Sequence, residues 1–177
     1  MKYILSFLGV GIVVLAIFLC GGQGTGAMPE EDYMRIHIQG NSNSSADQKV
    51  KYVVKDAVVE FLIPLMSEAT CKEEAQAIIT SNISKIEEVV NVTLRSEGAS
   101  YSGTVKITTE DMPARTYEQL TLDEGVYDSL SITLGQGHGD NWWCVVFPAV
   151  CFINSKNSQN VEYISKILEI INSVTKN

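Results

Sequence analysis

The sequence contains few of the residues from which catalytic and metal centres are usually built. Its 177 residues include 2 histidines and 4 cysteines, and no two cysteines have the CxxC spacing of a structural zinc site, so no metal is predicted. Basic residues are also scarce, with 13 lysines and arginines against 21 acidic residues and a formal net charge of −8. This charge repels phosphate backbones and anionic lipid headgroups, which argues against nucleic acid and charged membrane surfaces as partners.

A nucleotide-binding loop is missing as well. Gly135, Gly137 and Gly139 stand at every second position, which differs from the GxGxxG register, and no Walker lysine accompanies them. A phosphate cradle also needs a helix N-terminus directly after it, whereas residues 142–147 have the apolar character of a strand. No cofactor is therefore predicted.

Apolar runs long enough to span a membrane are absent except near the start of the chain. Lys2 precedes an uncharged apolar run over residues 3–20, and small residues follow over 21–27, which is the layout of a secretory signal. As a helix, the run would be about 27 Å long, enough for an uncleaved anchor. Residues 1–27 are therefore predicted to be a signal peptide or an N-terminal membrane anchor, and residues 28–177 a single exported domain.

Within the predicted domain, alternation of apolar and polar residues indicates β-strands. The predicted strands cover residues 33–39, 101–108, 126–134 and 142–147, with 112–117 as loop or edge strand. The last two strands are expected to form a hairpin across the glycine-rich loop 135–141.

Two longer stretches have the apolar periodicity of helices. The first follows a turn at 40–45, with Ser45 as N-cap and Gln48 as its capping-box partner, as the N-terminus of a helix requires. Pro64 is expected to end this helix.

The second helix is predicted to begin at Thr70 and Glu73, to run for about 25 residues, and to lie across the sheet. Gly98 stands just past its end, where a left-handed cap residue is expected. A short amphipathic helix over residues 161–174 closes the chain. The fold class is therefore α+β: a mainly antiparallel sheet with two long helices packed on one face and a short C-terminal helix.

The cysteines allow two interpretations. A small hydrolase can be drawn with Cys144 as nucleophile and His138 as base, but Cys144 lies in an apolar run, where a thiol is more often buried and inert. A disulfide between Cys144 and Cys151 is favoured instead. Pro148 can break the strand between them, and an exported domain would lie in an oxidising compartment, where disulfides form. Two buried free thiols are the alternative, and Cys71 is left over at the start of the second helix.

Trp142 and Trp143 are adjacent in a predicted strand, so their side chains should face opposite sides of the sheet. One of them can enter the core, and the other must be exposed or covered by another element. Because large aromatic side chains are enriched at binding hot spots, this pair indicates a docking surface.

Several stretches together resemble one protein family. They are Arg35-Ile36-His37-Ile38, Gly40-Asn41-Ser42-Asn43-Ser44, Asp47-Gln48, Lys55-Asp56-Ala57-Val58, and Gly135-x-Gly137-x-Gly139-x-Asn141-Trp142-Trp143-Cys144-Val145-Val146-Phe147-Pro148-x-x-Cys151-Phe152. This set resembles the stage II sporulation protein R family of endospore-forming bacteria over residues 34–152, and the block from Asn141 to Phe152 is its most specific part.

The resemblance implies a signal rather than an enzyme. Members of the family are made in the forespore and exported into the space between forespore and mother cell. There they activate a membrane-embedded aspartic protease, which cleaves pro-sigma-E on the mother-cell side. This chain would then be secreted into that space, or tethered to the forespore membrane if its N-terminal segment is retained, and would touch the membrane through that segment alone.

The expected partner is the extracytoplasmic part of the protease. The residues expected to contact it are Asn41, Ser42, Asp47, Gly137, Asn141, Trp142 and Trp143. Two other classes of function remain open on the sequence: a secreted cell-wall-binding module, which an exported acidic domain permits, and the small Cys/His hydrolase.

Overall fold

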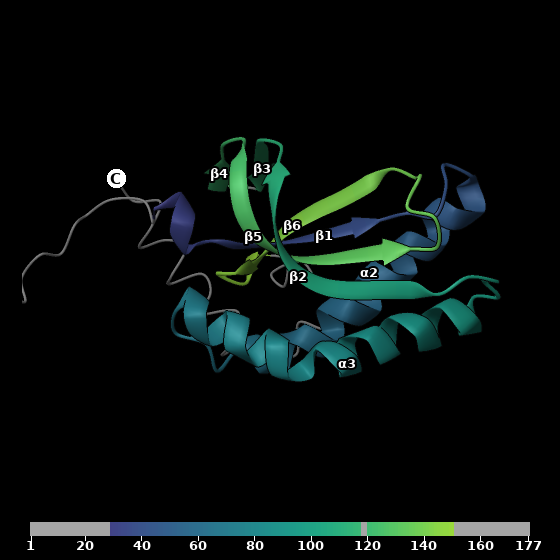
Figure 1. Cartoon of the computed structure of the whole chain (residues 1–177), viewed down its shortest axis with the longest axis horizontal. Coiled ribbons are helices and arrows are strands. Elements are labelled where there is room, and N and C mark those ends of the chain that lie inside the picture. Colours follow the sequence, from purple (N-terminus) through teal and green to yellow (C-terminus); the bar gives the residue numbers. More distant parts are fainter. Residues whose placement is uncertain (1–28, 118–119, 151–177) are drawn as a thin grey trace, which may run out of the picture.

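The structure is a computed structural model, and it describes residues 29–117 and 120–150. Its elements are a 3-10 turn η1 (Glu30–Asp32), strands β1 (Met34–Gln39), β2 (Gly103–Met112), β3 (Arg115–Tyr117), β4 (Leu120–Leu122), β5 (Gly125–Leu134) and β6 (Asn141–Phe147), and helices α2 (Ser45–Met66) and α3 (Lys72–Ser96). The two helices lie together on one side of the sheet, and the β3–β4 hairpin lies on the other (Figure 1). This arrangement confirms the α+β class.

The four-stranded sheet has the order β2-β5-β1-β6, in which β1 is parallel to β5 and the other pairs are antiparallel. The predicted hairpin of β5 and β6 is therefore wrong, because β1 lies between them. The first five residues of β1 are buried, because strands flank both of its edges and apolar clusters pack on both faces of the sheet. The connection from β5 to β6 must consequently cross the end of β1, where the turn before α2 begins.

The main core fills the space between the sheet and the helices. Alternate residues of β1 point into it, including Ile36 and Ile38, and they meet Val58 of α2 and Ile79 of α3, all at most 1% exposed. The two helices also pack on one another. The apolar stripes predicted from the sequence are therefore the faces that pack on the sheet and on each other.

The boundaries of α2 differ from those predicted. Ser44, not Ser45, is the N-cap, and its hydroxyl oxygen accepts from the backbone N–H of Asp47 at 3.1 Å. Pro64 does not end the helix, which continues to Met66. A proline within the last turn removes only one backbone hydrogen bond, so two further residues remain helical.

Helix α3 has the predicted length of 25 residues. It begins after Cys71, while Thr70 precedes it and donates its N–H and hydroxyl to the carboxylate of Glu74, both at 2.8 Å. Gly98 has the predicted left-handed conformation, with φ +75°. Its N–H bonds to the carbonyl of Arg95 at 3.1 Å, which closes the helix.

The face of the sheet away from the helices carries a second, smaller apolar cluster. Its buried members are Tyr33, Met112, Leu120, Leu122, Tyr127 and Val145, with Trp143 packed against them. The β3–β4 hairpin supplies part of this cluster, so the region predicted as loop or edge strand includes β3 as a short strand paired with β4.

Several predictions fall on residues that the structure does not describe: the N-terminal segment 1–27, the C-terminal helix over 161–174, and Cys151. Within the described ranges, no helix combines the length and apolarity needed to span a bilayer.

Candidate functional site

The turn after β1 and the loop after β5 form one joined surface, here called the turn–loop rim and defined as residues 40–44 and 135–141. Backbone bonds connect its two halves: Gly139 N–H donates to Gly40 O at 2.8 Å, Gly40 N–H to Asp140 O at 3.3 Å, and His138 N–H to Asn41 O at 3.1 Å. Residues of both halves are predicted from the sequence to lie at a partner surface. The structure brings them together because the loop must cross β1.

Asn41 joins the two halves through its side chain. Its Nδ2 donates to Oδ2 of Asp47 at 2.9 Å, and its Oδ1 accepts from the backbone N–H of Gln136 at 2.9 Å. Asn43 makes a similar connection, since its Oδ1 accepts from the N–H of Asp140 at 2.6 Å. Both side chains therefore fix the relative positions of the turn and the loop.

Asp47 is the polar centre beneath the rim. Ser42 Oγ donates to its Oδ2 at 2.5 Å, and the hydroxyl of Tyr101 donates to its Oδ1 at 2.7 Å. These bonds stabilise the carboxylate and lower the pKa of Asp47 to about 2, with the Ser42 bond the largest cause and the Tyr101 bond the next. Burial and the neighbouring carboxylate raise the pKa of Tyr101. Asp47 is therefore ionised at all physiological pH values.

Lys51 supports the loop from the first turns of α2. Its side chain is buried, and its Nζ donates to Gln48 Oε1 at 2.6 Å and to the carbonyl of Asp140 at 2.9 Å. Gln48 in turn donates to the carbonyl of Ser42 at 2.8 Å. Burial lowers the pKa of Lys51. The sequence did not indicate this role, because a lysine among polar helix residues is normally solvated.

The glycines of the loop are required by close packing. Gly135 has φ +57°, and a Cβ there would collide with the Asn41 side chain. Gly137 has φ +64°, and a Cβ on Gly139 would meet the backbone carbonyl of Ser42. Gly137, predicted as a contact residue, therefore shapes the loop through its backbone.

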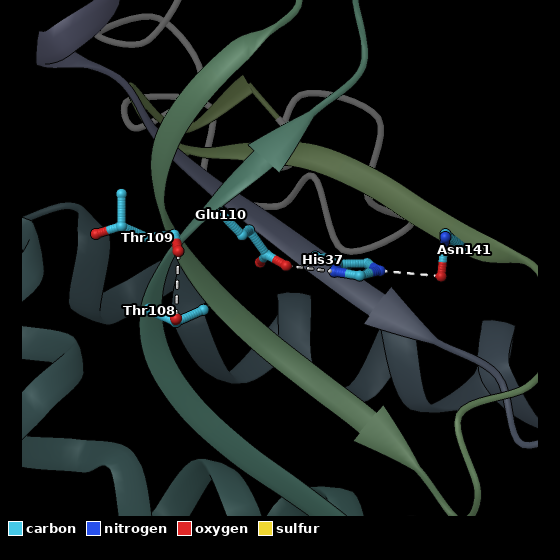
Figure 2. Close-up of polar contacts among 5 residues, drawn as sticks. All are labelled: His37, Thr108, Thr109, Glu110 and Asn141. Carbon is cyan, nitrogen blue, oxygen red and sulfur yellow. Dashed lines mark hydrogen bonds and ion pairs between the residues drawn. The ribbon is translucent and has the colours of Figure 1, made fainter.

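His37 lies at the centre of a second polar group, on the face of the sheet away from the helices (Figure 2). Its Nδ1 is 3.2 Å from Glu110 Oε2, and its Nε2 is 3.0 Å from Asn141 Oδ1. Trp143 stacks on the imidazole, with ring centroids 3.8 Å apart and planes at 19°. Both nitrogens face oxygen atoms, so both donate when the ring is an imidazolium. In the neutral ring, one bond requires the Asn141 amide to turn.

Arg35 lies two residues before His37 on the same face and is completely buried. Its Nη1 donates to Pro113 O at 3.0 Å, its Nη2 to the Tyr117 hydroxyl at 3.1 Å, and its guanidinium lies 5.0 Å from the Tyr127 ring centroid. Burial raises the pKa of both tyrosines. The guanidinium therefore attaches the β3–β4 region to the central strand.

The two tryptophans face opposite sides of the sheet, as predicted. Trp142 packs against the main core, with Lys55 Nζ 5.8 Å from its ring centroid, whereas Trp143 packs with the second cluster. Both are partly buried. Asn141, by contrast, is exposed at the start of β6 and links the rim to His37.

The residues of the alternative hydrolase are not assembled. Cys144 is 6% exposed in the main core, while His138 is exposed in the loop. In the described part of the chain, no cluster of histidine, cysteine or acidic side chains could hold a metal ion. The disulfide of Cys144 with Cys151 stays a prediction, because Cys151 lies outside the described residues.

Sequence reasoning missed His37, Glu110 and Arg35 as members of polar groups. The available signal was a pair of long polar side chains at alternate positions of a strand that is otherwise apolar, Arg35 and His37. Such a pattern normally indicates a solvated face. Here the bent sheet and the β3–β4 hairpin cover that face (Figure 1).

Comparison with known proteins identifies relatives of this chain. The family model described as Stage II sporulation protein R matches residues 30–157. The chain is also 35% identical over 129 residues to the Stage II sporulation protein R of Bacillus subtilis (strain 168), an alignment that covers 73% of this chain and 58% of that protein. The match thus spans less than two thirds of the relative's length. No solved structure is similar to the chain.

Proposed function

This chain belongs to the stage II sporulation protein R family and so has a role in sporulation, and on that premise we propose that it is an exported, non-catalytic signal. Its partner is the extracytoplasmic part of a membrane-embedded aspartic protease, which on activation processes pro-sigma-E in the mother cell. The N-terminal apolar segment supports export, because it has the layout of a signal peptide or anchor.

The observation that carries the proposal is the internal bonding of the turn–loop rim. The side chains of Asn41, Ser42 and Asp47 are occupied in holding the two halves together. The surface offered to a partner therefore consists of the exposed side chains around them. These are Asn43, Ser44, Gln136, His138, Asp140 and Asn141.

A rigid surface of this kind suits an activator. A ligand shifts a protease between inactive and active states only by binding the active state more tightly. A preorganised rim loses little conformational entropy on binding, so its full contact energy is available for that discrimination. Asn41, Ser42 and Asp47 act in this proposal as positioning residues.

The test is reconstituted pro-sigma-E cleavage with the protease and the double variant Gln136→Ala/His138→Ala. Both side chains are exposed and only their backbone N–H groups bond within the rim, so folding should be unchanged. We expect cleavage to fall roughly tenfold, as for loss of about 1.4 kcal/mol of contact energy. The matched control is Lys85→Ala/Glu97→Ala, exposed on and just after α3. Equal cleavage by both double variants would place the contact surface elsewhere.

A further inference from the structure

Strand β2 forms one edge of the sheet, and only the first part of that edge is covered. Asn91 of α3 accepts from the backbone N–H of Gly103 at 2.9 Å and donates to its carbonyl at 3.1 Å. Glu87 accepts from the N–H of Val105 at 3.2 Å. Side chains of α3 therefore replace a neighbouring strand at these two residues.

Beyond Val105, no strand of the described residues lies beside this edge. In an antiparallel pair, alternate residues bond inward to the neighbour and outward to the edge. Gly103 and Val105 bond outward, so Ile107, Thr109 and Asp111 do as well. In the described part of the chain, the one contact found for their backbone groups is a 3.4 Å approach of the Thr108 hydroxyl to the Thr109 carbonyl (Figure 2).

We propose that a second copy of this chain pairs with this open edge, antiparallel and about a two-fold axis through Thr108. In this register Ile107 of each copy lies opposite Thr109 of the other. The outward backbone groups of both residues then bond across the interface. A symmetric interface of this kind closes on itself and leads to a dimer rather than a filament.

The charges along the edge favour this register. Lys106 stands near one end of the open segment, and Glu110 and Asp111 stand at the other. Antiparallel pairing about Thr108 puts Lys106 directly opposite Glu110 of the second copy. Parallel in-register pairing would instead put Lys106 of one copy beside Lys106 of the other. Opposite charges facing across strands stabilise a pair, and like charges destabilise it.

The carboxylate of Glu110 can accept a further hydrogen bond from such a lysine. One of its carboxylate oxygens, Oε2, contacts His37, but Oε1 is buried with no hydrogen-bond partner. A lysine in the opposite strand would supply a donor close to this group. Because Glu87 and Asn91 end the ladder at Val105, the shared edge is short, and we expect a weak, reversible dimer.

Cysteine cross-linking of the full chain in detergent tests the register. Thr108 would meet its own copy across a non-hydrogen-bonded pair, with Cα atoms about 4.5 Å apart, within the range of a disulfide. Thr108→Cys should therefore yield covalent dimer at least about ten times faster than Thr104→Cys, whose Cα atoms would be roughly 26 Å apart. Thr104 is the matched control because it is exposed on the same face of β2. The parent chain sets the background from the native cysteines.

Thr109→Pro tests the edge itself. The N–H of Thr109 points outward, so its loss leaves the β2–β5 ladder intact, which far-UV circular dichroism can check. Added to Thr108→Cys, it should reduce cross-linking to the background rate. The proposal is overturned if Thr108→Cys reacts no faster than Thr104→Cys, or if proline leaves the rate unchanged. Either result would leave the proposed protease surface untouched, because the rim is made of other residues.

Discussion

The carboxylate of Asp47 shows how one residue organises a surface that it does not itself present. It accepts from Asn41, Ser42 and Tyr101, and these three come from the turn and from the segment before β2. The first two were predicted to contact a partner directly. The structure gives them internal bonds. The bond that joins Asn41 to the loop could not be predicted from the sequence, because its partner Gln136 lies 95 positions away in the chain.

Tyr101→Phe should destabilise the domain by about 1–2 kcal/mol at neutral pH, because a bond to a charged group is lost. The depressed pKa of Asp47 stabilises the fold above the ordinary value of 3.8, and this contribution disappears as pH falls toward about 2. The difference between variant and parent should shrink over that interval. Urea unfolding at several pH values measures it, with exposed Tyr52→Phe as control. A pH-independent difference would contradict the assignment.

Gly135 and Gly98 offer a matched pair of substitutions by alanine. Both have positive φ, +57° and +75°, so alanine at either position costs about 1–2 kcal/mol. A Cβ on Gly135 also collides with Asn41, whereas one on Gly98 meets nothing within 4 Å. Gly135→Ala should therefore lower the unfolding midpoint in urea clearly more than Gly98→Ala. Equal midpoints would mean that the loop packs less tightly on Asn41 than described.

At the scale of elements, local pattern predicted both long helices and the four strands of the main sheet, left β3 as loop or edge strand, and did not predict β4. Periodicity found β1, β5, β6 and both long helices, because each buries one recognisable face. It failed on the pairing of β5 with β6, since the order of strands depends on contacts between distant segments. The burial of Arg35 was missed for the same reason, because its partners Pro113 and Tyr117 follow about 80 residues later. The partners of His37 are also distant in the chain, since Glu110 and Asn141 lie 73 and 104 positions away.

Arg35→Met should loosen the β3–β4 hairpin more than the rest of the fold. Among the described strands, β3 and β4 pair only with each other, and the guanidinium bonds Pro113 and Tyr117 at the base of the hairpin. Losing two such bonds should speed amide exchange in residues 115–122 by roughly 10–100-fold. Hydrogen exchange read by mass spectrometry measures this, with His37→Gln as the comparison because His37 does not bond the hairpin. Uniform acceleration across the sheet would argue for a global effect instead.

At the scale of the whole molecule, the net charge of −8 and the apolar N-terminal segment both suit a domain that works outside the cytoplasm. The sequence predicted the family and the fold class, but it could not show that the described domain carries two polar groups on different faces. One lies under the turn–loop rim around Asp47. The other surrounds His37, and Asn141 touches both regions.

The oxidation state of the cysteines tests whether the protein is exported to an oxidising space outside the cytoplasm. In denaturant without reductant, alkylation of protein taken from sporulating cells should modify Cys71, the free thiol of the described chain, and leave Cys144 and Cys151 unmodified. After reduction, all three should react, as expected for a disulfide formed in an oxidising space. Cys20, the fourth cysteine, belongs to the predicted N-terminal segment and would add one further reactive thiol in both samples if that segment is retained. Alkylation of Cys144 before reduction would contradict both the disulfide and the predicted export.

The central place of β1 has a consequence for when the protein becomes active. Among the described strands, β1 is made first and lies between β5 and β6, which are made last. The sheet therefore has many contacts between distant parts of the chain and closes late. A polypeptide threaded unfolded through a translocation channel could not assemble its rim until residue 147 had emerged. Translocation across the membrane and folding of the rim would then be completed together, and a stalled or truncated chain could not bind the proposed protease partner.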